Sequence, residues 1–330
     1  MTRLILAMPL IYALLLTFAS CDNKIYNNSG AVWGTTYNIT YTSDRDLTDS
    51  VIAVMRQVED ELSMFAPSST VSLVNQGANP DVGSMFVDVF TLSQHINRIS
   101  GGAFDPTVGP LTNLWGFGYK HQSDSILPTD LQIDSILVAV GIDDCRIENN
   151  KVIKKHPSTV FDFSSIAKGY GVDAVASMLV RNGCTDFLVE IGGEIVTRGH
   201  NSHGQDWRVQ IDAPVSDADS HVSMLIIPLS DAAVATSGNY RNYRETSSGR
   251  IGHTINPHTG RPVQTSTASV TVIASDCATA DALATACMVM PLDSALLMIE
   301  ALPSVEALIA VSSADTFDLH PTSGFPYSTK

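Results

Sequence analysis

Two oxygen-bearing side chains stand one helical turn apart near the end of the chain. Asp281 and Thr285 belong to the segment of residues 276–285. This segment overlaps an apolar stretch, residues 277–289, that predicts a helix. Residues four apart share one face of a helix, so this carboxylate and this hydroxyl form an oxygen site that suits Mg²⁺ better than zinc. This interpretation places Asp281 on the helix surface. The alternative is a helix cap at Asp276 and a buried polar pair at 281 and 285.

A second segment, residues 162–173, joins a predicted strand ending at Asp162 to a predicted helix starting near Ser164. The free N–H groups at the start of a helix suit a phosphate, and Lys168 adds a cation nearby. The Asp162 carboxylate is able to accept hydrogen bonds from a heterocycle or a sugar. The alternative is that Asp162 or Ser164 only caps the helix, while Lys168 is solvated.

Three further segments combine glycine with polar residues. Residues 101–111 hold two glycines and two prolines, which favour a fixed loop that presents Asp105 and Thr107 to a ligand, or else a structural Ω-loop. Residues 190–194 carry a Gly-Gly pair between two strand segments, which predicts a bulge or a close backbone approach.

The last of these segments, residues 252–262, is built around Asn256-Pro257, a rigid turn that would hold His253 in place. A neutral histidine can act as a general base near physiological pH. His258, on the same loop, is the competing candidate.

Composition limits what these segments can bind. The chain has 330 residues, 44% of them hydrophobic, and a formal net charge of -15. The apolar content supports a folded core and argues against disorder. The negative charge disfavours nucleic-acid binding and means that an anionic dinucleotide would need a bridging cation. Four cysteines beyond the N-terminal region form no CxxC pair, so we expect neither a zinc site nor an obligatory disulfide.

The N-terminus has the form of an export signal. Arg3 precedes an apolar run over residues 4–18, and Ala19-Ser20-Cys21 resembles a bacterial lipobox. We expect residues 1–20 to be a signal peptide, Cys21 to be lipidated, and residues 22–31 to be a tether; the alternative is an ordinary cleaved signal peptide. Both interpretations export the chain. The lipobox places it on a periplasm-facing membrane, and Asp22 favours the inner membrane.

Residues 32–330 then form one predicted domain of the α+β class, with mixed, largely antiparallel sheets and packed helices, because strands come in runs rather than in strict alternation with helices. We expect strands at 37–41, 159–163, 185–191, 194–198, 207–212, 223–230, 232–237, 266–274 and 305–311. We expect helices at 51–65, 86–99, 128–140, 165–182, 277–289 and 292–301, and a hairpin turning at Asn149-Asn150.

Taken in this order, the segments resemble the FAD:protein FMN transferases, the ApbE family. The likeness runs from Trp33 to Thr285 and includes Leu62 to Asn75. It departs from the common family pattern at Trp33, where methionine is usual, at Asn256, where aspartate is usual, and at Phe163, where a small residue is usual. None of these departures removes a residue that the resemblance assigns to the metal, nor the proposed base.

The resemblance implies a site and a reaction. FAD is the substrate, and an acceptor protein with a Ser-Gly-Ala-Ser/Thr-x-Thr-like motif receives FMN on a Thr or Ser hydroxyl while AMP leaves. His253 is the implied base. The implied Mg²⁺ residues are Ser165, Ala167, Asp281 and Thr285. The implied FAD contacts are Trp33, Phe65, Ala103, Phe104, Asp105, Asp162, Lys168 and Ile255.

Two other functions fit the same motifs. A hydrolase would pass FMN to water, as an FAD pyrophosphatase. A non-catalytic lipoprotein would only bind FAD. A flavinylated carrier is rejected, because residues 29–34 place Gly34, which has no hydroxyl, at the acceptor position.

Overall fold

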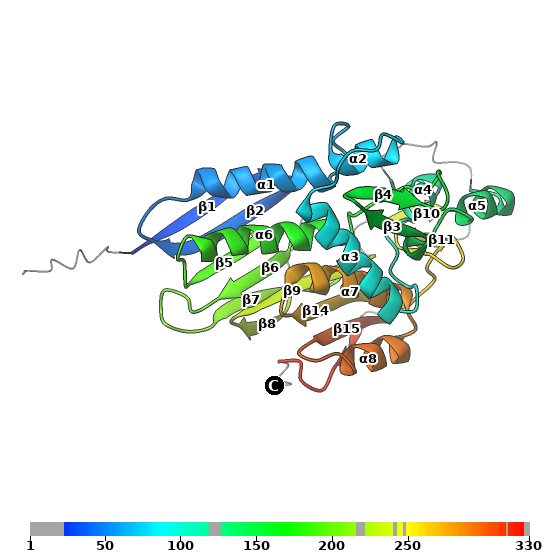
Figure 1. Cartoon of the computed structure of the whole chain (residues 1–330). Helices are drawn as coiled ribbons and strands as arrows, with labels where there is room; N and C mark the ends of the chain where they lie inside the picture. The colour runs from blue at the N-terminus through cyan, green and yellow to red at the C-terminus, as the bar shows by residue number, and fades with distance from the viewer. Residues whose placement is uncertain are drawn as a thin grey trace, which may run out of the picture.

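An eight-stranded antiparallel sheet runs through the molecule (Figure 1). The computed structural model describes residues 23–118, 127–215, 222–239, 243–246, 249–314 and 316–326. In spatial order the strands are β1 (Lys24–Val32), β2 (Thr35–Ser43), β5 (Phe187–Ile191), β6 (Glu194–Arg198), β9 (Ala232–Gly238), β14 (Thr267–Ala274), β15 (Glu306–Ser313) and β16 (Thr316–Pro321). Each neighbouring pair is antiparallel, so the predicted α+β class is confirmed.

Helices cover one face of this sheet and enclose the main core (Figure 1). They are α1 (Thr48–Leu62), α3 (Ser84–Ile99), α6 (Ala167–Arg181) and α7 (Cys277–Val289). Helix α1 buries residues at helical spacing, from Val51 to Leu62. Helix α7 is buried on nearly all sides because it packs on α6 and on strands β9 and β14.

The opposite face is covered by the hairpin of β7 (Trp207–Asp212) and β8 (Ser223–Leu229). Val209, Ile211 and Ile227 of this hairpin form a second hydrophobic cluster with Val234 and Leu308 of the sheet. Helix α8 (Leu292–Glu300) packs on β15. The sheet therefore has a packed layer on each side.

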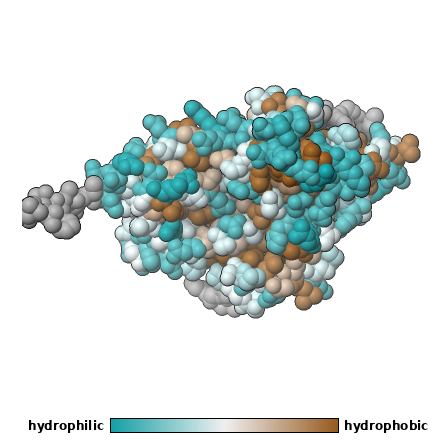
Figure 2. Space-filling model, in the orientation of Figure 1, coloured by the Kyte–Doolittle hydropathy of each residue, from teal (hydrophilic) through white to brown (hydrophobic). Residues whose placement is uncertain are grey.

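A smaller unit with its own hydrophobic cluster lies at one end of the molecule (Figure 1). Its elements are α4 (Gly109–Leu114), α5 (Asp130–Leu137), β10 (Tyr243–Thr246), β11 (Gly249–Gly252), β12 (Ile255–Asn256) and β13 (Arg261–Pro262). Trp115 and Ile133 are buried in it, and the Trp115 indole N–H donates to the Gly260 carbonyl at 2.8 Å. The tip of the molecule where α5 lies is hydrophobic (Figure 2), and Leu131 of α5 is 82% exposed.

Four shorter elements pack on the main core. They are α2 (Thr70–Asn75), the 3₁₀ turn η1 (Ile142–Asp144), β3 (Cys145–Glu148) and β4 (Lys151–Lys154). The predicted hairpin is confirmed: β3 and β4 pair, and Asn149 and Asn150 have φ angles of 51° and 60°, as a tight hairpin turn requires.

Several predictions of local structure are wrong. Residues 24–31 of the predicted tether belong to the domain instead, because they lie in β1, which pairs with β2 along its whole length. Residues 159–163 do not form a strand. The loop after Gly101 contains helix α4. Gly192 and Gly193 form the two-residue turn of the β5–β6 hairpin instead of a bulge, with φ angles of 62° and 93°. The alternative, a close backbone approach, is present, since the Gly192 N–H donates to the Thr36 carbonyl at 2.9 Å.

The predicted signal peptide and Cys21 lie outside the described residues. Among the residues that the structure describes, no helix is both long and apolar enough to cross a membrane. The cysteines at 145, 184, 277 and 287 are buried and unpaired.

Candidate active site

Helices α6 and α7 meet at their N-terminal ends. A Cβ atom at Gly169 would lie 2.4 Å from the Cys277 carbonyl oxygen, so glycine is needed for this approach. The Asp173 carboxylate accepts the first two backbone N–H groups of α7, each at 2.8 Å. This packing brings Lys168, at the start of α6, next to Asp281 in the second turn of α7.

Asp281 is buried, with 4% of its surface exposed, so the prediction that it lies on the helix surface is wrong. Its Oδ2 accepts the Gly169 N–H at 3.2 Å. One turn later, Thr285 Oγ1 lies 3.2 Å from Ser237 Oγ of β9. The alternative cap is also present, since Asp276 accepts from the backbone of Thr279 at 2.8 Å. Helix α7 therefore has both a cap, Asp276, and a polar pair, Asp281 and Thr285, that faces the cavity.

Three charged groups share this buried region. Lys168 Nζ forms an ion pair with Oε1 of Glu194, the first residue of β6, whose side chain is 3% exposed. Glu194 Oε2 is buried and has no hydrogen-bond partner among the described residues. Burial raises the pKa of Glu194 to about 7 against the pull of Lys168. Burial alone would lower the pKa of Lys168, but Glu194 and Asp281 outweigh it and raise that pKa.

No side chain caps helix α6, because its cap position is Ile166. The alternative in which Asp162 or Ser164 caps this helix is therefore wrong. Asp162 Oδ1 instead accepts the backbone N–H of Ser164 at 3.0 Å and its hydroxyl at 2.5 Å, which forms a turn before the helix begins. Burial raises the pKa of Asp162, and the bonds from Ser164 act in the other direction.

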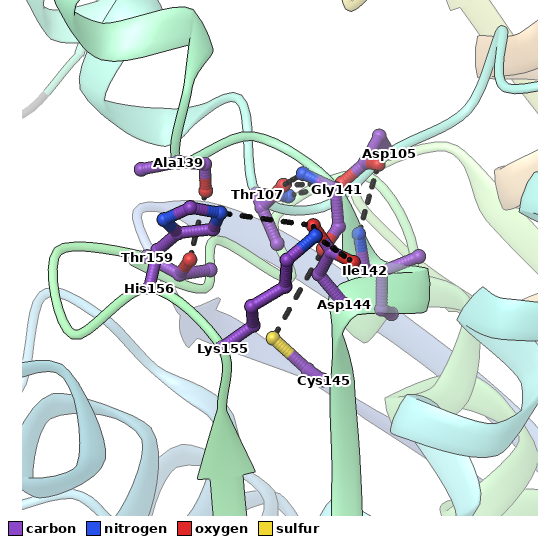
Figure 3. A network of polar contacts seen from close by, with 10 residues as sticks. All are labelled: Asp105, Thr107, Ala139, Gly141, Ile142, Asp144, Cys145, Lys155, His156 and Thr159. Carbon is purple, nitrogen blue, oxygen red and sulfur yellow. Dashed lines mark hydrogen bonds and ion pairs between the residues drawn. The ribbon is translucent and has the colours of Figure 1, made fainter.

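The Asp105 side chain holds the loop from Gly101 to Val108 in place through hydrogen bonds (Figure 3). Asp105 Oδ1 accepts the Thr107 backbone N–H at 2.8 Å, and Oδ2 accepts the Ile142 N–H at 3.1 Å. Thr107 Oγ1 accepts the Gly141 N–H at 2.8 Å and is 1% exposed. The prediction that the loop presents Thr107 to a ligand is therefore wrong. Asp105 lines the cavity, but its carboxylate oxygens hold the loop together.

Of the two histidines on the Asn-Pro segment, His253 is the one that lines the cavity. Its ring lies edge-on to Phe117, with the ring centroids 6.4 Å apart. His258 instead points to the neighbouring loop, where its Nε2 lies 3.0 Å from the Gly101 carbonyl oxygen. Thr254 Oγ1 donates to Asn239 Oδ1 at 2.7 Å and anchors the residue after His253.

These elements enclose a cavity of about 320 Å³. Ten of the predicted site residues line it: Ala103, Phe104, Asp105, Asp162, Ser165, Lys168, His253, Ile255, Asp281 and Thr285. Glu194 and Ser237 line it as well and were not predicted. Residues 190–194 did stand out in the sequence, but the partner of Glu194 is 26 residues away, and no local pattern indicates that pairing.

A second, more apolar hollow of about 580 Å³ adjoins the first, and Ser164 and Lys168 line both. It holds the other three predicted residues, Trp33, Phe65 and Ala167. Phe65 is 68% exposed. The Trp33 ring lies against Gly171, where a Cβ atom would come within 2.2 Å of it, so glycine is what allows the indole to line this hollow.

A larger hollow of about 1500 Å³ lies beyond the His253 segment. Arg261 is the one charged residue among the described residues that line it, and its guanidinium is paired with Asp130. Of the predicted site residues, it contains none. The smaller pair of hollows is therefore the candidate site.

Comparison with known proteins points to one family. The ApbE family model matches residues 33–309. The chain is 38% identical to a FAD:protein FMN transferase of Vibrio cholerae over 330 residues, covering 96% of this chain and 98% of the relative. It is 35% identical to a FAD:protein FMN transferase of Haemophilus influenzae, covering 86% of each chain.

Solved structures agree with the sequence relatives. The flavin transferase ApbE from Vibrio cholerae superposes with a TM-score of 0.82 at 36% identity, over 92% of this chain and 98% of that one. The apo flavinyl transferase ApbE of Pseudomonas stutzeri gives 0.82 at 31% identity, over 92% and 96%. By its sequence and its fold, this chain belongs to the ApbE family.

Proposed function

We propose that this chain transfers FMN from FAD to a Thr or Ser hydroxyl of an acceptor protein and releases AMP. The observation that carries the proposal is the pair of adjoining hollows with the start of α6 as their shared wall. FAD has two ring systems joined by a pyrophosphate. A helix N-terminus and an ammonium group, here that of Lys168, are what a pyrophosphate requires at such a wall.

His253 is the general base in this proposal. It removes the proton from the acceptor hydroxyl, whose oxygen then bonds to the phosphorus on the FMN side. The bond from that phosphorus to the oxygen bridging to the AMP phosphate breaks, and AMP leaves with the bonding electrons. Transfer of this kind depends on charge neutralisation and positioning more than on covalent catalysis, which suits a site rich in fixed charges.

The residues present fit a magnesium ion. The cavity offers the Asp281 carboxylate with the hydroxyls of Thr285 and Ser165, all hard oxygen donors. Two buried carboxyl groups lie beside one ammonium group, so a cation bound here would favour their charged forms. In the described parts of the chain, no cluster of three or more His, Cys, Asp or Glu side chains could hold a metal unaided. Substrate oxygens and water would complete the shell, and the ion would neutralise pyrophosphate charge.

Ala167 would contribute to the ion only through its backbone, because its side chain has no donor atom. It lines the apolar hollow beside Lys168 rather than the polar cavity. The remaining contacts proposed for FAD divide in the same way: Trp33 and Phe65 offer aromatic surface in the apolar hollow, while Ile255 and Phe104 line the polar one.

We also propose that the chain is exported and attached to a periplasm-facing membrane, with the inner membrane favoured, through a lipid on Cys21. The support is the lipobox-like Ala19-Ser20-Cys21 after an apolar run. Fractionation of cells producing Cys21→Ala tests this, because that variant should leave the membrane fraction. A wild-type chain that takes up no radiolabelled fatty acid would rule out the lipid anchor.

The transferase itself is tested by incubating residues 23–330 with FAD, Mg²⁺ and a peptide that carries a Ser-Gly-Ala-Thr-x-Thr motif. Intact-mass spectrometry of the peptide should show a gain of one FMN group, and EDTA should prevent it. Free FMN and AMP without any gain would favour the pyrophosphatase. Intact FAD would leave two explanations, a protein that only binds the dinucleotide or a peptide that is not its acceptor.

A further inference from the structure

Glu194 has a defined place in the site, although neither its motif nor the family resemblance gives it a role. It follows the Gly192-Gly193 turn, and its side chain is 3% exposed. A carboxylate this deeply buried is costly unless it is paired. Its partner is Lys168, from the helix across the cavity. Burying the Glu194 carboxylate costs free energy, which indicates that this residue has a function in the cavity that it lines.

Lys168 has two acids within reach. It pairs directly with Glu194, while Asp281 accepts the N–H of the next residue, Gly169, at 3.2 Å and lines the same cavity. An ammonium group beside two carboxyl groups pairs with whichever carboxylate is available. If Glu194 carried no charge, Asp281 would be the remaining partner. Lys168 and a divalent cation would then compete for the same carboxylate.

We propose that Glu194 is a positioning residue that holds the Lys168 ammonium group and so keeps Asp281 available to bind a divalent cation. This inference rests on the proposed function, because it assumes that Asp281 binds the metal. The inference adds one requirement to the proposed function: metal binding at Asp281 depends on Glu194, which acts through Lys168. Lys168 is then held beside the cation, where both can face the pyrophosphate.

The test measures cation affinity rather than turnover. Mn²⁺ is titrated into residues 23–330 saturated with FAD, because substrate oxygens complete the proposed metal shell, and free Mn²⁺ is followed by its electron paramagnetic resonance signal. We expect Glu194→Gln to weaken Mn²⁺ binding by about 10–100-fold, the usual loss when a residue supporting a metal ligand is changed. Lys168→Met should not weaken binding. The double variant should bind Mn²⁺ within a few-fold of Lys168→Met, because no ammonium group remains to occupy Asp281.

The matched control is Glu190→Gln on the same hairpin. Glu190 accepts the Gly193 N–H at 2.8 Å and the Asn38 side chain at 2.8 Å, and it does not line the cavity. A glutamine can still accept the Gly193 bond, so Mn²⁺ affinity should match that of the wild type. Melting temperatures without metal show whether Glu194→Gln is folded, and its crystal structure should place the Lys168 ammonium group in hydrogen-bond contact with Asp281.

Three outcomes would overturn the proposal. Glu194→Gln that binds Mn²⁺ as tightly as the wild type would show that Asp281 needs no such help. A double variant that binds as weakly as Glu194→Gln would show that Glu194 does not act through Lys168. A wild-type protein that binds no Mn²⁺ would remove both this inference and the metal from the proposed function, whereas the first two outcomes leave the proposed function intact.

Discussion

At the scale of single residues, His253 and His258 stand five positions apart and have different surroundings. His253 lines the cavity, while His258 contacts the Gly101 carbonyl. The sequence left these two candidates open, because a turn motif shows that a histidine is held in place but not which way it points. Only packing between the segment and the loop at Gly101 distinguishes them.

The proposed role of His253 as a base predicts a selective loss of FMN transfer. His253→Ala should slow FMN transfer by about 10²–10⁴-fold, the usual contribution of a general base, with little change in FAD affinity. Single-turnover kinetics and FAD titration separate the two effects. His258→Ala is the control. Its rate of FMN transfer should fall by less than about tenfold, because the substitution removes one hydrogen bond worth about 1 kcal/mol. A loss confined to FAD affinity in His253→Ala would make it a binding residue.

Because Asp281 is buried, its role is tested with a substitution that keeps its hydrogen-bond acceptor. Asp281→Ala would leave the Gly169 N–H without its acceptor, at a cost of about 1–3 kcal/mol. Asp281→Asn keeps an acceptor oxygen but loses the charge. We expect Asp281→Asn to lower Mg²⁺-dependent transfer by more than about 100-fold. Mutating a residue that only hydrogen-bonds to a metal ligand already costs about 10–100-fold in metal affinity or activity.

The readout for Asp281→Asn includes the rise in melting temperature that Mg²⁺ and FAD produce together, which should vanish. Asp276→Asn, in the same helix, is the control. Asparagine caps a helix as well as aspartate does, and Asp276 does not line the cavity. Asp281→Asn that keeps its Mg²⁺ response would remove Asp281 from the metal site.

At the scale of elements, helices and core strands were predictable because their apolar spacing is local. Strands β6 and β7 and helix α7 have the predicted bounds. Strand β1 was missed because its Asn-, Ser- and Gly-containing sequence has little strand preference, and pairing with β2 is what orders it. The contact between α6 and α7 was missed as well, since it depends on a glycine, Gly169, meeting the backbone of a segment more than a hundred residues away.

The contact between α6 and α7 has a pH dependence, because burial raises the pKa of Asp173 to about 7. The folded protein therefore holds a proton here that the unfolded chain releases near the ordinary value of 3.8. The stability from this group is present below that value and is lost as the pH rises through about 7. Asp173→Asn removes the titration, so it should cost more stability at pH 5 than at pH 8. Urea unfolding at both pH values measures this, and an equal or larger cost at pH 8 would contradict it.

At the scale of the whole molecule, the site lies where two parts with separate cores meet. The main core carries the start of α6 and Asp281, while the smaller cluster around Trp115 and Ile133 carries the His253 segment. Motif order in the sequence was enough to predict which segments line the two hollows of the candidate site. The division into two adjoining hollows was not predictable, because it depends on side chains such as Trp33 and Ser164 that only the folded chain brings together.

The central claim is that breaking the FAD pyrophosphate is coupled to labelling an acceptor hydroxyl. The most direct measurement counts AMP by chromatography and acceptor-bound FMN by intact mass in the same reaction of residues 23–330 with FAD, Mg²⁺ and acceptor peptide. We predict one AMP for each FMN attached, and neither product with EDTA or when the acceptor Thr is replaced by Ala. AMP that forms at the same rate with that replaced peptide, accompanied by free FMN, would contradict the transferase and leave a hydrolase.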